Sequence, residues 1–261
     1  MKIAFFDSGI GGITVLHQAM LTLPGEDYLY YADVDHVPFG RKSREQIVTY
    51  TDDAVRFLTG LGAGAVVIAC NTATCSAIGY VREKYRGVPI LGMEPAVKPA
   101  VEENDAGRVL VVATPVTVRG ERLKDLLARV DCRHCVDTLA LPELVTFAEN
   151  GEFVSQGVRR YLAEQFRPYR MDGYSALVLG CTHFNFFKDT FREFLSPKTE
   201  IIDGSAGTVS HLADVLGLTA GRAGDGGTVV EYYASGRKVT DPDELRRIAG
   251  LHARLDQMLR C

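Results

Sequence analysis

Short, continuous runs of apolar and β-branched residues alternate with longer stretches of helical periodicity along most of this chain. Strands that are apolar throughout are typical of a parallel sheet covered by helices on both faces. Segments such as Arg44–Leu61 and Phe153–Gln165 have the helical periodicity that such a cover needs. The sequence therefore predicts an α/β fold. The expected strands are Lys2–Phe6, Tyr28–Tyr31, Ala65–Ala69, Pro89–Leu91, Arg108–Ala113, Ala176–Leu179, Glu200–Ile202 and Thr228–Tyr233.

Composition excludes several classes of function. Of the 261 residues, 46% are hydrophobic and 24% charged, which is ordinary for a globular protein of one large or two small domains. A net charge of −4 with both signs interspersed argues against a nucleic-acid-binding surface. No apolar run reaches the roughly 20 residues of a membrane span, and no secretion signal is evident. We therefore expect a cytoplasmic protein whose cysteines are free thiols.

Four of the expected strands end in residues that carry chemistry, and these ends form two similar pairs. In each pair the first strand leads into a hydroxyl-bearing loop, DSGIGG after Phe6 and TPVT after Ala113, and the later strand ends in Cys70 or Cys181. The similar spacing within the pairs indicates a duplicated unit. Because ligands bind at the carboxyl ends of parallel strands, each unit would present one thiol to a shared cleft.

The duplication predicts two pseudo-symmetric lobes that face each other across this cleft. We expect the chain to cross between them at Met93–Pro95 and again at Asp203–Gly204. Residues 1–94 and 205–261 would then form the first lobe, and residues 95–204 the second.

A thiol between a strand and the start of a helix lies at the positive end of the helix, which favours the thiolate and lowers the pKa from about 8.5. Cys70 and Cys181 both have this position. A free cysteine is more often a small buried apolar residue, and Cys75, farther into the next helix, is expected to be one. The twin placement of Cys70 and Cys181 favours a catalytic role for that pair.

Two other patterns bear on cofactors. Cys132 and Cys135 have CxxC spacing, but zinc needs a second pair of ligands, and Cys261 with scattered histidines does not provide one. The glycines after Asp7 approach the dinucleotide pattern GxGxxG, but Thr14 stands where glycine or alanine is required. We therefore expect no metal and no nicotinamide cofactor. The glycine turn would instead let backbone amides approach a small anion.

Polar residues beside the cysteines are further candidates for the site. Asp7 and Ser8 follow the first strand and would face a ligand, although Asp7 could instead cap the next helix. His183, two residues after the second cysteine, could tune that thiol or be an ordinary satisfied polar group. Glu149, late in the helical run 142–150, carries no local signal and could equally be a solvated helix residue.

Four motifs, DSGIGG, AD...PFG, ACNTAT and GCTHF, occur in this order with these intervals. Together they resemble the glutamate racemases of the aspartate/glutamate racemase superfamily. The likeness extends from Ile3 to about Leu216 and more weakly to the end. The GCTHF form, with His183, favours glutamate racemases over the aspartate and hydantoin racemases of that superfamily.

The resemblance implies an isomerase that interconverts L- and D-glutamate without a cofactor, supplying D-glutamate for peptidoglycan synthesis and so for cell-wall biogenesis and cell shape. It implies that Cys70 removes the proton from D-glutamate, with Asp7 beside it. Cys181 removes the proton from L-glutamate, with Glu149 and His183 beside it. A homodimer is compatible with the sequence, which does not specify it. Substrate contacts are implied for Ser8, Phe39, Gly40, Asn71, Thr72, Thr117 and Thr182.

This chain departs from the family's pattern at two places. The family usually has tyrosine where Phe39 stands, so only a backbone role carries over to this position. The sequence LPELVTFAENGEF, which contains Glu149, matches the family poorly.

Other functions also fit parts of the pattern. A racemase acting on another acidic amino acid, such as aspartate, would use the same two thiols. A cysteine hydrolase or amidotransferase would use Cys70 as nucleophile and His183 as base, which leaves Cys181 without a role. A two-lobed protein that only binds an amino acid would need neither thiol.

Overall fold

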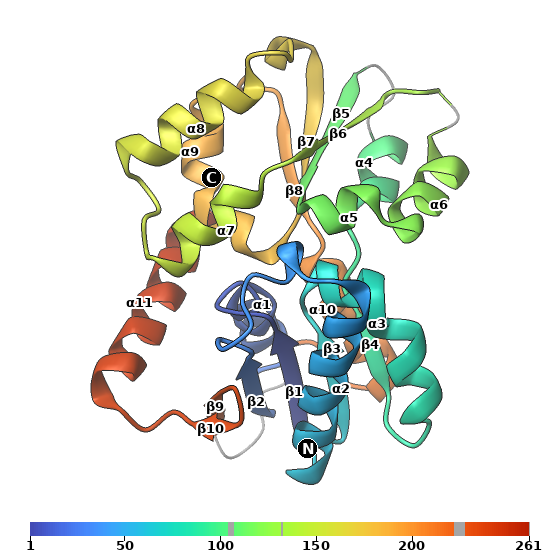
Figure 1. Cartoon of the computed structure of the whole chain (residues 1–261), viewed down its shortest axis with the longest axis vertical. Coiled ribbons are helices and arrows are strands. Elements are labelled where there is room, and N and C mark those ends of the chain that lie inside the picture. The colour runs from blue at the N-terminus through green and yellow to red at the C-terminus, as the bar shows by residue number, and fades with distance from the viewer. Residues whose placement is uncertain (104–106, 132, 222–227, 261) are drawn as a thin grey trace.

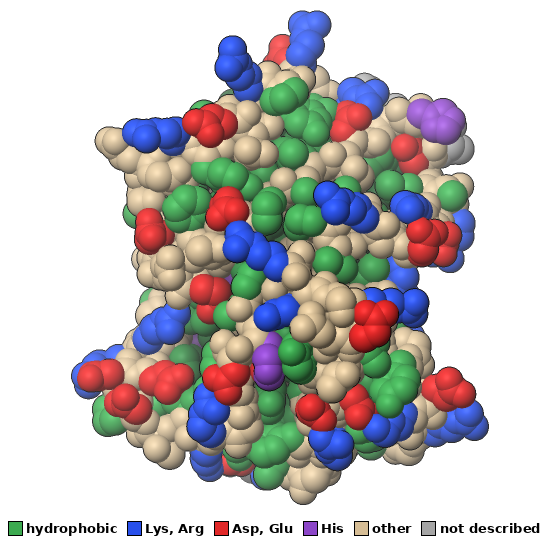
Figure 2. All heavy atoms as spheres, in the orientation of Figure 1, with side chains coloured by type: hydrophobic (Ala, Val, Ile, Leu, Met, Phe, Trp, Pro, Cys, Tyr) green, Lys and Arg blue, Asp and Glu red, His purple; other side chains and the backbone are tan. Residues whose placement is uncertain are grey.

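The computed structural model describes residues 1–103, 107–131, 133–221 and 228–260. They form two lobes, each built around its own sheet and stacked along the long axis of the molecule (Figure 1). The α/β class with two lobes, expected from the strand pattern, is confirmed. In the view of Figure 2 the outline narrows between the lobes, and acidic and basic side chains are interspersed over the surface.

The first lobe contains a six-stranded sheet that is parallel except for one edge strand. Its central strands are apolar on both faces, as the sequence pattern predicts. In spatial order the strands are β10 (Arg237–Lys238), β9 (Val230–Ala234), β2 (Asp27–Ala32), β1 (Lys2–Asp7), β3 (Ala65–Ile68) and β4 (Ile90–Gly92).

The second lobe contains a parallel sheet of four strands. Its order repeats the order β2-β1-β3-β4 of the first sheet, so the duplication seen in the sequence is also a duplication of topology. β5 takes the place of β1, and β7 takes the place of β3. In spatial order the strands are β6 (Val136–Ala140), β5 (Arg108–Ala113), β7 (Tyr174–Gly180) and β8 (Glu200–Asp203).

The sequence pattern missed β6 and β10 and extended one helix too far. β6 has the mixed sequence VDTLA because it is a half-exposed edge strand, and β10 has only two residues. The helix expected from Phe153 begins at Gln156, because the Ser155 side chain accepts the N–H of Val158 and caps it there.

Helices cover both faces of each sheet. No helix in the described ranges is long and apolar enough to cross a membrane. The first sheet is covered by α1 (Ile13–Thr22), α2 (Arg44–Gly60), α3 (Asn71–Lys84) and α10 (Ser205–Leu216). The second lobe contains α4 (Val97–Glu102), α5 (Pro115–Arg119), α6 (Glu121–Val130), α7 (Pro142–Glu149), α8 (Gln156–Phe166) and α9 (Lys188–Arg192). Short 3₁₀ helices within the described ranges are η1 (Phe39–Arg41), η2 (Met171–Gly173) and η3 (Thr182–Phe187).

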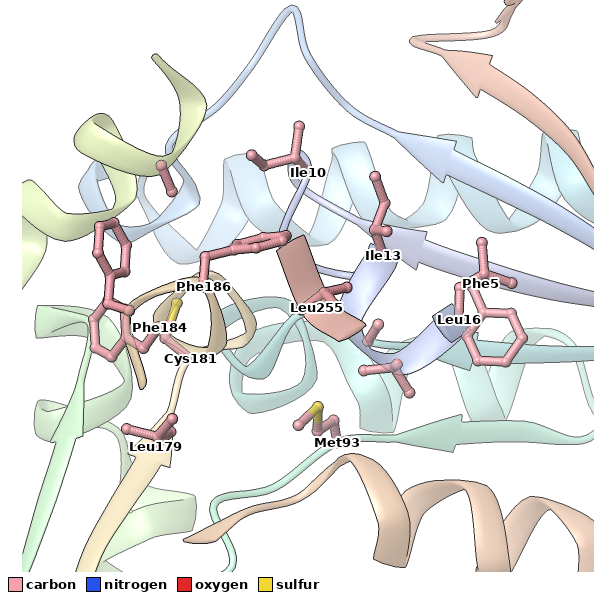
Figure 3. Packing of buried hydrophobic residues seen from close by; sticks show 14 of the residues in the cluster. Phe5, Ile10, Ile13, Leu16, Met93, Leu179, Cys181, Phe184, Phe186 and Leu255 are labelled. Atoms are coloured by element: carbon pink, nitrogen blue, oxygen red, sulfur yellow. The ribbon is translucent and has the colours of Figure 1, made fainter. Parts of the chain in front are cut away.

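The last helix, α11 (Pro242–Met258), connects the lobes. It follows the edge strands of the first sheet and runs toward the second lobe (Figure 1). It packs on both α1 and η3. The apolar cluster to which its Leu251 and Leu255 belong includes Phe5 of the first sheet and Leu177 of the second. The two lobes therefore share one continuous core, part of which Figure 3 shows.

Candidate active site

The polar residues at the four predicted strand ends meet between the lobes. The Thr182 hydroxyl donates to Oδ2 of Asp7 at 3.0 Å, and the hydroxyl oxygens of Thr72 and Thr114 lie 2.9 Å apart. Each of these contacts joins one lobe to the other, and all four side chains are buried. The duplicated strand ends therefore form one site, as the topology of parallel sheets predicts.

Cys70 is the N-cap of α3 and is only 6% exposed. Its Sγ accepts the N–H of Ala73 at 3.4 Å and lies 3.7 Å from Oγ of Ser8. Burial raises the pKa of Cys70 to about 12, the charge of Asp7 adds to the rise, and the Ala73 N–H offsets only part of it. The expectation of a lowered pKa is wrong for this thiol, because desolvation outweighs the helix end.

Asp7 lies at the end of β1 with no exposed surface. The Gly9 N–H donates to its Oδ1 at 2.9 Å, and Thr182 donates to its other oxygen. Burial raises the pKa of this carboxyl group, and the opposing charge of His183 and the hydrogen bonds offset the rise only in part. Gly12 occupies the N-cap position of α1, so Asp7 does not cap that helix.

Cys181 lies beside a hydrogen-bonded pair of titratable side chains. Its Sγ is 3.8 Å from Nδ1 of His183, and Nε2 of His183 is 2.7 Å from Oε1 of Glu149. Burial lowers the pKa of His183, but the hydrogen bonds to Cys181 and Glu149 outweigh burial and hold that pKa well above its usual value. Both ring nitrogens can then donate, as in an imidazolium. A positive charge beside the sulfur stabilises the thiolate.

The structure brings Glu149 into the site although its surroundings in the sequence gave no signal. The carboxylate lies at the C-terminal end of α7 and receives the backbone N–H of Ile10 from the other lobe at 2.9 Å. Burial favours a higher pKa for Glu149, but its contacts with His183 and Ile10 outweigh burial, and the pKa is lowered. Glu149 is therefore the ionised partner of His183.

The glycines of DSGIGG allow the first lobe to approach these residues. A Cβ on Gly9 would overlap the Glu149 carboxylate, and one on Gly11 would overlap the ring of His183. The sequence predicts that this turn presents amides to a small anion. In this structure the anion that the Ile10 amide binds is the side chain of Glu149.

The other predicted contact residues lie along the same junction. The Thr117 hydroxyl is 3.1 Å from that of Thr114, at the start of α5. Asn71, at the start of α3, donates through Nδ2 to the Met93 carbonyl at 3.4 Å. Its Oδ1 is buried and has no hydrogen-bond partner among the described residues. An unpaired buried amide oxygen is costly, so this atom is available for a ligand that donates a hydrogen bond.

The Phe39 side chain faces away from the junction. Its ring is 1% exposed and packs in the first lobe, with ring centroids 6.2 Å from Phe6 and 6.0 Å from Tyr50. A Cβ on the next residue, Gly40, would lie 3.2 Å from Cβ of Thr114. The loop therefore meets the second lobe through its backbone at Gly40, and a substrate contact from Phe39 is restricted to its main chain.

Sequence reasoning missed two residues that support the site. The Tyr30 hydroxyl donates to the Gly9 carbonyl at 2.6 Å, and the Thr14 hydroxyl donates to the Thr182 carbonyl at 3.2 Å. A tyrosine in a strand buried on both faces needs a partner for its hydroxyl, so Tyr30 carried a usable signal. Thr14 carried none, because its partner lies in the other lobe.

Besides Cys70 and Cys181, the structure describes two cysteines, Cys75 and Cys135. Cys75 is half-buried where α3 faces Gly120 of the second lobe and belongs to no apolar core cluster, so the expected core packing is wrong: this side of α3 turns toward the other lobe and not toward its own sheet. Cys135 is half-buried, while Cys132 and Cys261 lie outside the described residues. Within the described ranges, no three His, Cys, Asp or Glu side chains are grouped to hold a metal ion.

Comparisons with known proteins show the family to which the chain is similar. Residues 16–212 match the model of the Asp/Glu/Hydantoin racemase family. A glutamate racemase of Lachnospira eligens is 51% identical over 99% of both chains. The structure of a Francisella tularensis glutamate racemase in complex with D-glutamate has a TM-score of 0.78 at 25% identity, covering 96% of this chain and 92% of that one. The Escherichia coli glutamate racemase in complex with L-glutamate has a TM-score of 0.77 at 27% identity, covering 95% and 94%.

Proposed function

This chain belongs to the Asp/Glu/hydantoin racemase family and, within it, to the glutamate racemases, and we propose that its Cys70 and Cys181 interconvert L- and D-glutamate by proton transfer at the α-carbon. It is an isomerase, and the D-glutamate that this family makes is used in peptidoglycan synthesis. One observation supports the residue roles above all others: two lobes of equivalent topology each bring one buried thiol, with its own acid, to a single junction.

In the direction from L to D, the Cys181 thiolate takes the α-proton and becomes a thiol. The Cys70 thiol gives its proton to the opposite face of the carbanion and becomes a thiolate. The reverse reaction exchanges the roles, so the enzyme must prepare one thiolate and one thiol on opposite sides of the substrate. The raised pKa of Cys70 and the protonated His183 beside Cys181 suit the direction from L to D.

The carbanion has to be stabilised by the chain's own groups. The junction is buried, so fixed dipoles act there in a low-dielectric environment. The N-terminal end of α3 and the Asn71 amide lie beside Cys70, and the Thr72, Thr117 and Thr182 hydroxyls lie nearby. These groups can hold the substrate's two carboxylates and its ammonium group.

Glutamate is the proposed substrate because two similar proteins are described in complex with its two enantiomers. The test is to incubate the purified protein with single enantiomers of glutamate and of aspartate and to separate the products by chiral chromatography. We expect each glutamate enantiomer to approach an equal mixture and aspartate to react at least tenfold more slowly. Preferred racemisation of aspartate, or hydrolysis without inversion, would contradict the proposal.

Three further expectations are retained as proposals. The strands of the first sheet fall within residues 2–92 and 230–238 and those of the second within 108–203, which supports lobe limits of 1–94 with 205–261, and 95–204. A cytoplasmic location is tested by cell fractionation. A homodimer is tested by light scattering of the purified protein.

A further inference from the structure

The segment that carries His183 is a local structure that needs outside support. It is η3, a six-residue 3₁₀ helix that begins directly after Cys181. Runs of this helix longer than three or four residues are uncommon, because their hydrogen bonds are poorly aligned. No side chain caps the N-terminal end of η3, and its last carbonyl groups need partners from elsewhere. The position of His183 therefore depends on what packs against η3.

Arg254 of α11 supplies those partners at the far end of η3. Its Nη2 and Nε donate to the Phe186 carbonyl at 2.8 and 3.2 Å, and its Nη2 also donates to Oδ1 of Asp189 at 2.7 Å. The side chain is only 13% exposed. A planar guanidinium can hold a carbonyl and a carboxylate together, which an ammonium group does less well.

Aromatic rings also pack around the contact between Arg254 and the end of η3. The Arg254 guanidinium lies 5.7 Å from the centroid of the Phe153 ring, and the centroids of the Phe153 and Phe186 rings are 5.2 Å apart. Figure 3 shows Phe186 beside Leu255, the neighbour of Arg254 in α11. These contacts fix the conformation of the Arg254 side chain, and Arg254 in turn fixes the end of η3.

We propose that Arg254 is a positioning residue for the Cys181 half of the reaction, holding η3 so that His183 stays in register with Cys181 and Glu149. The inference rests on the proposed two-thiol racemisation. Arg254 makes no contact with the Cys70 side among the hydrogen bonds and ion pairs of the described residues. Its loss should therefore affect one half of the reaction more than the other.

The two halves have to be separated before they can be compared. The equilibrium constant of a racemase is one, so kcat/KM is equal for both enantiomers in any variant that still racemises. Exchange of the α-proton in D₂O avoids this constraint. A Cys70→Ala variant can exchange only through Cys181, which acts on L-glutamate, and a Cys181→Ala variant only through Cys70, which acts on D-glutamate.

Arg254→Gln is then introduced into each single-thiol variant, and exchange is followed by NMR. We expect exchange of L-glutamate by Cys181 to fall at least tenfold and exchange of D-glutamate by Cys70 to change less than threefold. Arg254→Lys should recover part of the loss, since it keeps one charged donor. Equal losses for both enantiomers, or no loss for L-glutamate, would overturn the proposal. Arg246→Gln is the matched control, because Arg246 is exposed on the same helix and its ion pair among the described residues is with Asp243 of the same helix.

A second measurement does not depend on turnover. In the otherwise unchanged enzyme, we expect Arg254→Gln to move the NMR titration of the His183 ring toward the ordinary histidine pKa, and the control Arg246→Gln to leave the His183 titration unchanged. An unchanged His183 titration would overturn the positioning role. If neither single-thiol variant exchanges any substrate, the proposed function fails, but the titration still tests Arg254.

Discussion

The two halves of the site have equivalent places in the fold and opposite electrostatics. On the first-lobe side, Cys70 lies next to Asp7, both are buried, and each has a raised pKa. On the second-lobe side, Cys181 lies next to His183, whose pKa is raised, and His183 binds Glu149, whose pKa is lowered. The first half favours neutral groups, and the second contains an ion pair.

This difference shows how a duplicated fold can serve a reaction that needs two different protonation states. The repeat places two thiols symmetrically, but a symmetric environment would leave both thiols protonated or both ionised. Desolvation on one side and an imidazolium on the other resolve that conflict. Each half also depends on the other lobe. Asp7 of the first lobe accepts a hydrogen bond from Thr182 of the second, and Glu149 of the second lobe accepts one from Ile10 of the first.

Removing either thiol is the strongest test of this comparison. We expect Cys70→Ala and Cys181→Ala each to lower racemisation by at least about a thousandfold, because one face of the carbanion loses its acid. In D₂O, the first variant should label only L-glutamate and the second only D-glutamate, both without inversion. Labelling of the same enantiomer by both variants, or racemisation near the wild-type rate by either, would disprove the assignment of the two bases.

His183→Asn should remove the charge that separates the two halves. We expect racemisation to fall about a hundredfold, the usual scale for a positioned acid–base group. Added to Cys70→Ala, the change should suppress exchange of L-glutamate; added to Cys181→Ala, it should leave most exchange of D-glutamate. A similar loss for both enantiomers would show that His183 serves the whole junction and not the Cys181 half.

Gly9→Ala tests the close approach of the two halves. The added methyl group would overlap the Glu149 carboxylate, so the lobes must shift. We expect a loss of about 1–3 kcal/mol in the free energy of unfolding and at least a tenfold loss of activity. Gly79→Ala, in α3, is the control: apart from its own helix backbone and chain neighbours, no atom of the described residues lies within 4 Å of the new methyl group, and alanine favours the helix. Urea unfolding of both variants measures the difference, and a Gly9 variant as stable and active as the Gly79 variant would contradict the close contact.

Asp7→Asn should expose the cost of a buried carboxyl group. The folded pKa of Asp7 is raised above the ordinary value of 3.8, so the stabilising contribution of this group is present below that value and is lost as the pH rises through the folded pKa. Asparagine has no such loss, so the variant should gain in melting temperature over the wild type as the pH rises above about 4, while its activity falls. A gap in melting temperature that is constant across this range would contradict a raised pKa.

Local sequence information was sufficient to predict the fold class, most of the strands and the position of the site. Continuous apolar runs identified eight of the strands, because a strand in a sheet buried on both faces is apolar throughout. The pattern missed β6 and β10, which lie at sheet edges and are not apolar throughout. The repeated strand ends identified both cysteines, and parallel topology put them in one site. The repeat also contained the signal for β6, since the first unit has β2 in the equivalent place.

The chemistry of that site depends on tertiary structure. Glu149 has no distinctive neighbours in sequence and gains its role because the fold brings it to His183 and to the Ile10 amide of the other lobe. The direction of the Cys70 pKa shift reversed the expectation from its helix position, because burial exceeds the effect of a helix end. The local sequence predicts the position of each proposed catalytic cysteine between a strand and a helix. Its protonation depends on desolvation and on nearby charged side chains, and only the folded chain decides these: Asp7 lies near Cys70, and His183, held by Glu149, lies near Cys181.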